Sequence, residues 1–110
     1  MAIHLKSVRV ERWPVDGQFV ISRGAKDHVD VIVAEIGDTP GDEGTIGRGE
    51  GTPLYYLGED AAGCRDQILH AAAHIADLGA AEARAAVPEI MAPGAASNAL
   101  DCALWDLEAK

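Results

Sequence analysis

Two histidines, His70 and His74, have the spacing of a metal-binding pair. They lie four residues apart in an Ala-rich segment of helical period, so their rings project from one face of the expected helix. Two imidazoles at this spacing can bind one metal ion, and Asp66 and Asp77 belong to the same polar stripe. A catalytic metal site needs a third ligand, for which the sequence offers no obvious source. The sequence therefore favours the ordinary alternative, a solvated helix face.

Arg23 is a second candidate, because it is a lone cation between an apolar stretch and Gly24. A guanidinium can hold a carboxylate through two parallel hydrogen bonds. A chain with nine Lys and Arg against eighteen Asp and Glu needs such a local cation to bind an acidic ligand. An exposed arginine at a strand end is the more common arrangement. The pattern alone leaves both interpretations open.

The connection 52–59 carries four large side chains, which either cover core or line a pocket: Leu54, Tyr55, Tyr56 and Leu57. Glu50 and Glu59 lie at its two ends, and a carboxylate can act as a general acid or base. Since neither has an evident partner, we expect both to be structural or solvated. The Gly-rich run 47–51 lacks the GxxxxGK pattern of a phosphate loop. The sequence contains no nucleophile–base pair and no cofactor motif.

The composition is that of one folded domain with an acidic surface. The chain has 110 residues, of which 48% are apolar and 25% charged, and it is much shorter than a barrel of about 250 residues. Its formal net charge of -9 argues against binding to nucleic acid or to an anionic membrane. No apolar run is long enough for a transmembrane helix. The N-terminus lacks the pattern of a signal peptide, so we expect a cytoplasmic protein whose reduced thiols, Cys64 and Cys102, fill a core.

The N-terminal half predicts a three-stranded antiparallel meander. In the first predicted strand, the alternation of apolar residues changes phase at Lys6-Ser7, which indicates a bulge. We expect this strand to stop near Trp13-Pro14, because proline cannot donate a hydrogen bond to the neighbouring strand. Residues 29–36 are apolar on both faces, as is typical of a central strand. A third strand over 45–51 has one face made of glycines, which allows another backbone to approach closely: Gly47, Gly49 and Gly51.

The C-terminal half predicts helices, which makes the fold class α+β. A first helix over 61–78 has Asp60 at its N-cap and Gly79 as its C′ glycine. A short helix over 81–86 is expected to end before Pro88. A last helix begins after Pro93-Gly94 and has a clear apolar face, formed by Leu100, Ala103, Leu104 and Leu107. It has no stop signal, so a truncated chain and a frayed natural end both stay open.

Four stretches of this sequence resemble a known family: Trp13-Pro14 with 19–24, then 47–53, then Gly58-Glu59, and then 95–107. The sequence resembles the N-terminal capping domain of the enolase superfamily. Within it, the sequence is most similar to dipeptide epimerases of the L-Ala-D/L-Glu type in the muconate lactonizing subgroup. The stretch 98–107 is specific to the superfamily, and 19–24 tilts the choice to dipeptide epimerases. The resemblance covers the whole of this chain, but it covers only about the first third of a family member.

The resemblance implies that 1–110 is a cap, with the meander in 1–59 and helices in 60–110, packed over a barrel that is absent from this chain. Two loops, about 15–26 and 51–58, would close the active site and select the substrate. Arg23 would bind the acidic side chain of the dipeptide's second residue. The other substrate-binding positions implied are Phe19, Ile21, Leu54 and Tyr55.

The family's reaction abstracts a proton from a carbon next to a carboxylate, with Mg²⁺ stabilising the enediolate and lysines on opposite faces acting as base and acid. The metal ligands and lysines belong to the barrel, so no catalytic or metal-binding residue is assigned to this chain. The implied partners are a dipeptide, the chain's own barrel and a second copy in a homo-oligomer. Family members often have Arg-Tyr where this chain has Tyr56-Leu57, which leaves the preferred dipeptide open.

The first hypothesis is therefore the substrate-specificity cap of a Mg²⁺-dependent dipeptide epimerase, inactive without its barrel. A neighbouring hypothesis is the cap of another enzyme of the same subgroup: an N-acylamino acid racemase, an o-succinylbenzoate synthase or a cycloisomerase. A third is a stand-alone module that self-associates through exposed apolar surface.

Overall fold

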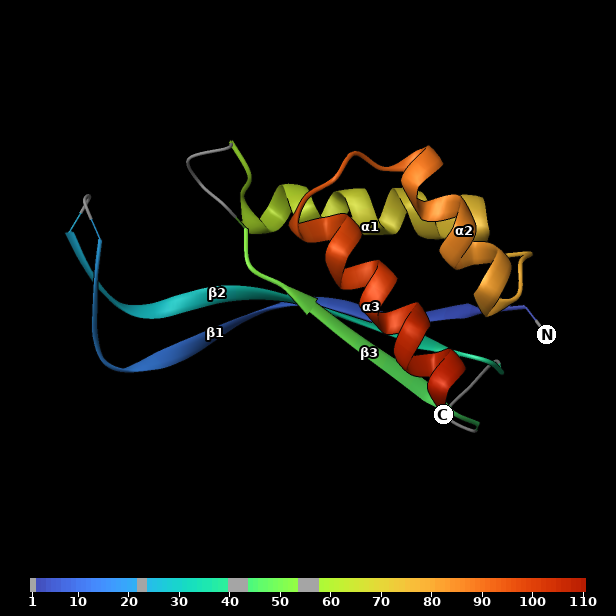
Figure 1. The fold of residues 1–110 in the computed structure, drawn as a ribbon, viewed down its shortest axis with the longest axis horizontal. Helices are drawn as coiled ribbons and strands as arrows, with labels where there is room; N and C mark the ends of the chain where they lie inside the picture. The colour runs from blue at the N-terminus through green and yellow to red at the C-terminus, as the bar shows by residue number, and fades with distance from the viewer. Residues whose placement is uncertain (1, 22–23, 40–43, 54–57) are drawn as a thin grey trace.

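The protein folds as a three-stranded antiparallel sheet with helices on one face (Figure 1). This computed structural model describes residues 2–21, 24–39, 44–53 and 58–110, without the side chains of 15–27. In chain order the elements are β1 (His4–Ile21), β2 (Gly24–Gly37), β3 (Ile46–Gly51), α1 (Ala61–Ile75), α2 (Ala80–Ile90) and α3 (Ala95–Ala109). The sheet order is β1–β2–β3, so the predicted α+β class and meander are confirmed. Within the described ranges, no helix is both long and apolar enough to span a membrane.

β1 and β2 extend well beyond β3 as a two-stranded ribbon (Figure 1). β3 pairs only with Ile32–Gly37, whereas β1 and β2 stay paired up to Ile21 and Gly24. The prediction that the first strand stops near Trp13-Pro14 is wrong. Pro14 is still paired with His28, and a register shift follows it before Phe19. Because β1 is an edge strand, it tolerates a proline that cannot donate to the ladder.

β2 is the central strand and is buried on both faces, as predicted. Ile32, Ala34 and Ile36 belong to the core under the helices, while Val31 and Val33 are buried on the opposite face. The predicted bulge is also confirmed, because the β1–β2 register shifts between Leu5 and Ser7.

α3 lies directly on the glycine face of β3. A Cβ atom added to Gly49 would lie 2.1 Å from the carbonyl oxygen of Ala99 and 2.4 Å from the amide nitrogen of Ala103. Cβ atoms at Gly47 and Gly51 would each lie 2.3 Å from a backbone oxygen of the same helix. The predicted close approach of another backbone is therefore confirmed, and its partner is the last helix. The apolar face of α3 is buried in the core at Leu100, Ala103, Leu104 and Leu107.

The helix boundaries correct two predictions. α1 ends at Ile75, and Gly79 is the N-cap of α2 with a φ of -75°, so it is not a left-handed C′ residue. The turn after α1 instead ties into the sheet, because the Leu78 carbonyl accepts from the Ile3 amide at 2.9 Å. α2 runs through Pro88 to Ile90 instead of ending before it. Pro88 has no amide to donate to the Arg84 carbonyl, so it removes one bond of the last turn, and α2 ends two residues later at Ile90.

The cysteines differ in their environment. Cys64 is buried on the inner face of α1, where burial raises the pKa of its thiol, so it fills the core as predicted. Cys102 is exposed on α3, so the expectation that both thiols fill a core is wrong for this residue. It lies on the outer flank of the helix, away from the buried side chains that hold α3 on β3.

Candidate functional site

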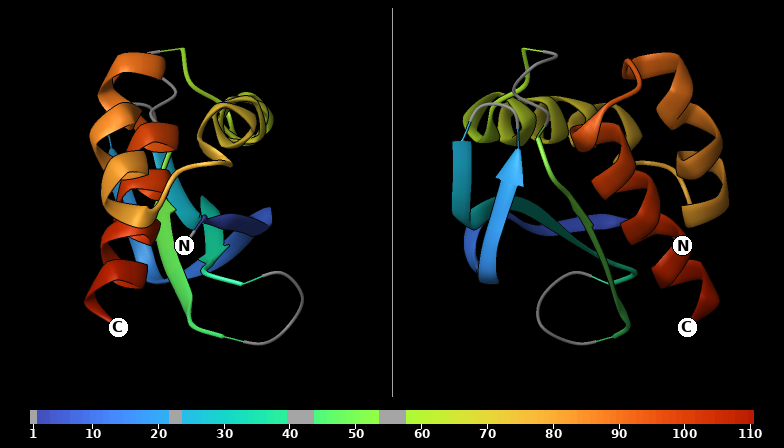
Figure 2. Two further views of the ribbon diagram at one scale, coloured as in Figure 1. Left: turned by 90° about the vertical axis from the view of Figure 1, so that its right-hand side faces the viewer. Right: turned by 60° about the vertical axis from the view of Figure 1, so that its left-hand side comes forward.

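The two segments predicted to face a substrate emerge at the same end of the molecule. Figures 1 and 2 show the far end of the β1–β2 ribbon, the end of β3 and the start of α1 on the side of the molecule opposite the two termini. The antiparallel order explains this arrangement, since β1 ends, β2 begins and β3 ends toward the same end of the sheet. The meander therefore gathers both segments on one side of the domain.

The incoming end of the β3–α1 connection is held against α3. The side-chain amide of Asn98 donates to the carbonyl oxygen of Glu50 at 3.2 Å. Gly51 lies so close to α3 that an added Cβ would be 2.3 Å from the carbonyl oxygen of Ala95. Pro53 follows and is buried. The last described residues before the connection thus have a fixed position relative to the first turn of α3.

The outgoing end of the connection is held at the same place. A carboxylate oxygen of Glu59 accepts from the backbone amide of Ala95 at 3.0 Å, one of the amides left free at the start of a helix. The next residue, Asp60, caps α1 by accepting from the Gly63 amide at 2.6 Å. Two neighbouring acids therefore cap two different helices. Both ends of the connection depend on the N-terminus of α3.

The first turn of α3 also caps itself. The hydroxyl of Ser97 accepts from the Gly94 amide and donates to the Gly94 carbonyl, both at 3.0 Å. Gly94 lies close to Glu59, because an added Cβ would be 2.3 Å from its carboxylate oxygen. A side chain at position 94 would therefore displace the carboxylate that caps the helix. Glycine at this position keeps the contact between Glu59 and α3 open.

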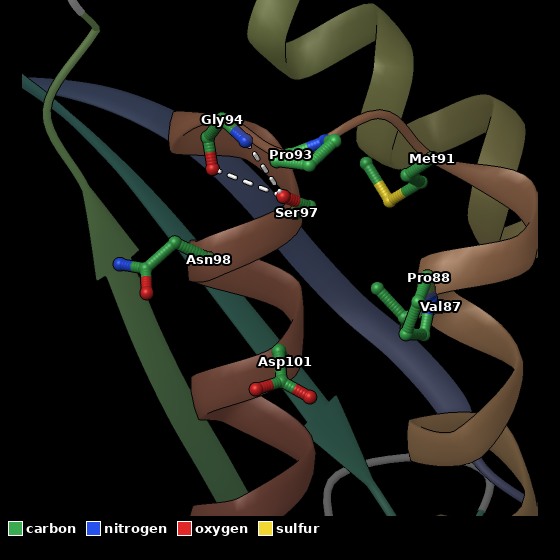
Figure 3. Close-up of a pocket in the computed structure, with 8 residues that line it drawn as sticks. All are labelled: Val87, Pro88, Met91, Pro93, Gly94, Ser97, Asn98 and Asp101. Carbon is green, nitrogen blue, oxygen red and sulfur yellow. Dashed lines mark hydrogen bonds between the residues drawn. The ribbon is translucent and has the colours of Figure 1, made fainter.

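A groove of about 480 Å³ runs between α2 and α3, lined by Val87, Pro88, Met91, Pro93, Gly94, Ser97, Asn98 and Asp101 (Figure 3). Its polar groups are already engaged at two positions: Ser97 caps α3, and the Asn98 amide holds β3. Asp101 is the ionisable side chain among the residues that line the groove. A single carboxylate without a nucleophile or a second titratable group does not form an acid–base pair. The groove therefore carries no catalytic centre.

A network of charges covers the sheet face opposite the helices. Glu35 accepts from Arg48 at 2.9 Å, from Arg9 at 2.5 Å and from the Ser7 hydroxyl at 3.0 Å. The hydrogen bonds from Arg48 and Arg9 lower the pKa of Glu35 from 4.5 to about 2. Arg9 also bonds to Glu11, so the network continues along β1. Since the charges satisfy one another, we assign this network to the stability of the sheet rather than to ligand binding.

Known proteins with this arrangement are dipeptide epimerases and their relatives, although no family model matches the chain. The chain is 39% identical over 108 residues to the L-Ala-D/L-Glu epimerase of Escherichia coli K12. This alignment covers 96% of the chain and 32% of that enzyme. The chain is also similar to a solved structure from Agrobacterium tumefaciens, an enolase family member with homology to dipeptide epimerases. The two are 40% identical and superpose with a TM-score of 0.81, over 98% of this chain and 31% of that protein. That structure contains sodium and L-Ala-L-Glu.

The chain has the fold of the N-terminal capping domain of the enolase superfamily. A third relative, the dipeptide epimerase of Enterococcus faecalis complexed with Mg and L-Leu-L-Tyr, is 28% identical with a TM-score of 0.77, over 98% of this chain and 31% of its own. The capping domain spans about a third of the length of these relatives. The resemblance stated from the sequence is therefore confirmed.

Of the predicted substrate-binding residues in this capping domain, Arg23, Leu54 and Tyr55 lie outside the described residues. Phe19 and Ile21 are described by their backbone alone, in β1 opposite Lys26 and Gly24. Most of the predicted loop over 15–26 is therefore strand, in which Phe19–Ile21 pair with Gly24–Lys26 after the register shift. The roles of these five residues stay predictions, and what the capping domain fixes is the end at which their segments emerge.

The two acids considered for acid–base chemistry are structural or solvated, as expected. Glu59 caps α3, and Glu50 is exposed with its carbonyl held by Asn98. Sequence reasoning missed that Glu59 caps the last helix, because the pairing with Ala95 joins residues far apart in the chain. The adjacent Asp60 was recognisable because its helix follows at once.

The histidine pair lies on the exposed face of α1. The Nε2 atoms of His70 and His74 are 3.3 Å apart, and no group of three metal-ligating side chains occurs in the described part of the chain. Both side chains are exposed.

Proposed function

We propose that the chain is the substrate-specificity cap of a dipeptide epimerase whose barrel lies outside these 110 residues. The observation that carries the proposal is the match over 98% of the chain to a relative that contains L-Ala-L-Glu. The arrangement of the sheet supports it, because the meander brings both candidate substrate-facing segments to one end. We assign the strands 1–59 and the helices 60–110 to one capping unit.

In this proposal the end of the β1–β2 ribbon supplies the group that recognises an acidic dipeptide. Arg23 lies between the two strands, and its guanidinium would hold the side-chain carboxylate of the second residue through paired hydrogen bonds. Phe19 and Ile21 would form an apolar wall beside it. The formal charge of -9 makes a local cation necessary, since the rest of the cap repels an anionic substrate.

The β3–α1 connection would complete the pocket with Leu54 and Tyr55. Its two ends are fixed on α3 through Asn98 and Glu59, so these side chains would be presented from a rigid base. Rigid support of this kind lowers the ordering cost of binding. The connection has Tyr56-Leu57 where family members often have Arg-Tyr, so in this proposal Arg23 would be the cation that selects an acidic side chain.

The reaction we propose for the whole enzyme is a proton transfer at the α-carbon of the second residue, which removes the proton from one face and returns it to the other. Mg²⁺ would supply charge stabilisation for the enediolate. Its ligands and the proton-transfer residues would lie in the barrel, so the cap alone is proposed to be inactive. The cytoplasmic location and a homo-oligomeric state stay predictions.

The test is Arg23→Ala in the full-length enzyme, assayed on L-Ala-L-Glu and on the neutral L-Ala-L-Leu. Loss of one charged contact predicts a fall in kcat/KM of about 100-fold for the acidic dipeptide and little change for the neutral one. The matched control is Arg12→Ala, which removes an arginine of the same ribbon that pairs with Asp30 at 3.0 Å. An equal fall for both dipeptides, or none for either, refutes the assignment.

The same assay separates the neighbouring hypotheses. A full-length enzyme that racemises N-acylamino acids, forms o-succinylbenzoate or cycloisomerises muconate, and leaves dipeptides unchanged, belongs to another branch of the subgroup. A self-associating module has a different outcome. It predicts concentration-dependent sedimentation of the 110-residue chain and no epimerase activity in any longer form of the protein.

A further inference from the structure

The face of α1 that points away from the core carries an ordered pair of imidazoles. The Nε2 atoms of His70 and His74 are 3.3 Å apart, and the two rings meet edge to face with centroids 4.8 Å apart. Both side chains are exposed, so neither ring is needed to fill the core. The separation is that of a hydrogen bond between the two rings, and a metal ion would replace the shared proton once both Nε2 atoms are unprotonated.

This separation matches two ligands of one metal ion. Imidazole nitrogens bind Zn²⁺ at about 2.0–2.1 Å, and at a tetrahedral angle two such nitrogens are roughly 3.3–3.4 Å apart. The nitrogen separation in α1 is 3.3 Å. A metal ion can therefore enter with small ring rotations and no change in the helix backbone.

The helix is held rigidly enough to preserve this geometry. The opposite face of α1 is buried at Cys64, Ile68, Ala71 and Ile75. The carboxylate of Asp60 caps its first turn. A helix fixed in this way does not have to fold around the metal, so the ordering cost of chelation is confined to two side chains.

The local charge and the ligand chemistry determine which ions fit. Asp66 lies one turn before His70 on the exposed surface, and its carboxylate, 3.9 Å from the Arg65 guanidinium, adds negative charge on this side of the helix. Imidazole suits Zn²⁺, Cu²⁺ and Ni²⁺, whereas Mg²⁺ prefers oxygen ligands.

We propose that α1 carries a surface site for a divalent transition-metal ion, in which Nε2 of His70 and Nε2 of His74 are the protein ligands. Water molecules complete the coordination, since the described residues provide no third ligand. The site takes Ni²⁺ and Zn²⁺ and rejects Mg²⁺. It is independent of the proposed epimerase function.

The test is isothermal titration of the protein with NiCl₂ at pH 7.5 in excess MgCl₂. Ni²⁺ is preferred to Cu²⁺ as the probe because Cu²⁺ oxidises exposed thiols such as Cys102. We expect one Ni²⁺ site that is weakened about tenfold or more in His70→Gln and equally in His74→Gln. The matched control His4→Gln removes a histidine from β1 and should bind Ni²⁺ like the wild type.

Two results would overturn the proposal. One is the absence of Ni²⁺ binding to the wild type, and the other is binding that both glutamine variants retain. Far-UV circular dichroism of each variant shows whether the helices are kept, and exposed glutamine is well tolerated in a helix. ZnCl₂ provides a second probe, for which the same pattern of loss is expected.

Discussion

The contact between α3 and the glycine face of β3 should make Gly49→Ala strongly destabilising. The added Cβ would lie 2.1 Å from the Ala99 carbonyl oxygen and 2.4 Å from the Ala103 amide nitrogen. An ordinary contact begins near 3.4 Å, so α3 or β3 must move by roughly 1.3 Å. Both obstacles are backbone atoms, and neither can rotate away. Overpacking of this kind costs about 3 kcal/mol.

A part of that cost is offset in the unfolded chain. Alanine has less backbone freedom than glycine, which returns about 0.5–1 kcal/mol. The net loss in the free energy of unfolding is therefore about 2 kcal/mol. For a domain of this size the loss lowers the Tm by about 8 °C or more. In urea, with a slope of about 2 kcal/mol per molar, the midpoint falls by about 1 M.

The assay is urea unfolding of the 110-residue chain, followed by far-UV circular dichroism. Gly63→Ala in α1 is the control, since its added Cβ meets a side-chain atom that can shift, the Asp60 carboxylate oxygen at 3.0 Å, and no backbone atom. That oxygen caps α1, so part of the cap, worth about 1 kcal/mol, is lost while helix propensity returns up to about 1 kcal/mol, and the control should lie close to the wild type. If Gly49→Ala unfolds at the same urea concentration as the wild type, α3 does not lie against β3 as described.

Three further predictions concern the anchors and the charge network. Glu59→Ala should lower the free energy of unfolding by about 1 kcal/mol, measured by thermal unfolding, and should raise the KM of the full-length enzyme. Glu59→Gln keeps an acceptor for the Ala95 amide, so its effect should be milder, and equal effects of the two variants would contradict the capping role. Asn98→Ala should raise KM in the same way, because it frees the Glu50 carbonyl at the other end of the connection. Glu35 has a folded pKa of about 2 against an ordinary 4.5, so its stabilising contribution is complete above about pH 4.5 and disappears as the pH falls toward 2. Acid titration of stability should therefore be flatter in Glu35→Gln, and an unchanged slope would contradict the network.

The features that could be predicted from the sequence are those determined by local pattern. The alternation and phase change before Ser7 predicted the bulge, and the three glycines of β3 predicted a close backbone neighbour. In both cases the physical cause lies within a few residues. Asp60 is a further example, since the helix that it caps follows directly.

The features that could not be predicted depend on position in the whole fold. Pro14 was expected to end a strand, and it does not because β1 is at the edge of the sheet. Pro88 was expected to end the helix before it, and α2 instead continues for two residues beyond it despite the amide bond that proline removes. The capping of α3 by Glu59 joins two segments that only the complete fold brings together. The substrate-facing roles of Arg23 and Leu54 rest on the resemblance, since both lie outside the described residues.

If this domain serves an enzyme that epimerises dipeptides, the full-length enzyme with Mg²⁺ should exchange the α-proton of L-Ala-L-Glu in D₂O, which proton NMR follows. We expect deuterium at the α-carbon of the second residue together with formation of the L-Ala-D-Glu epimer. We also expect the exchange to slow about 100-fold in Arg23→Ala. Retention of the α-proton with L-Ala-L-Glu and with neutral dipeptides alike would contradict the proposed function.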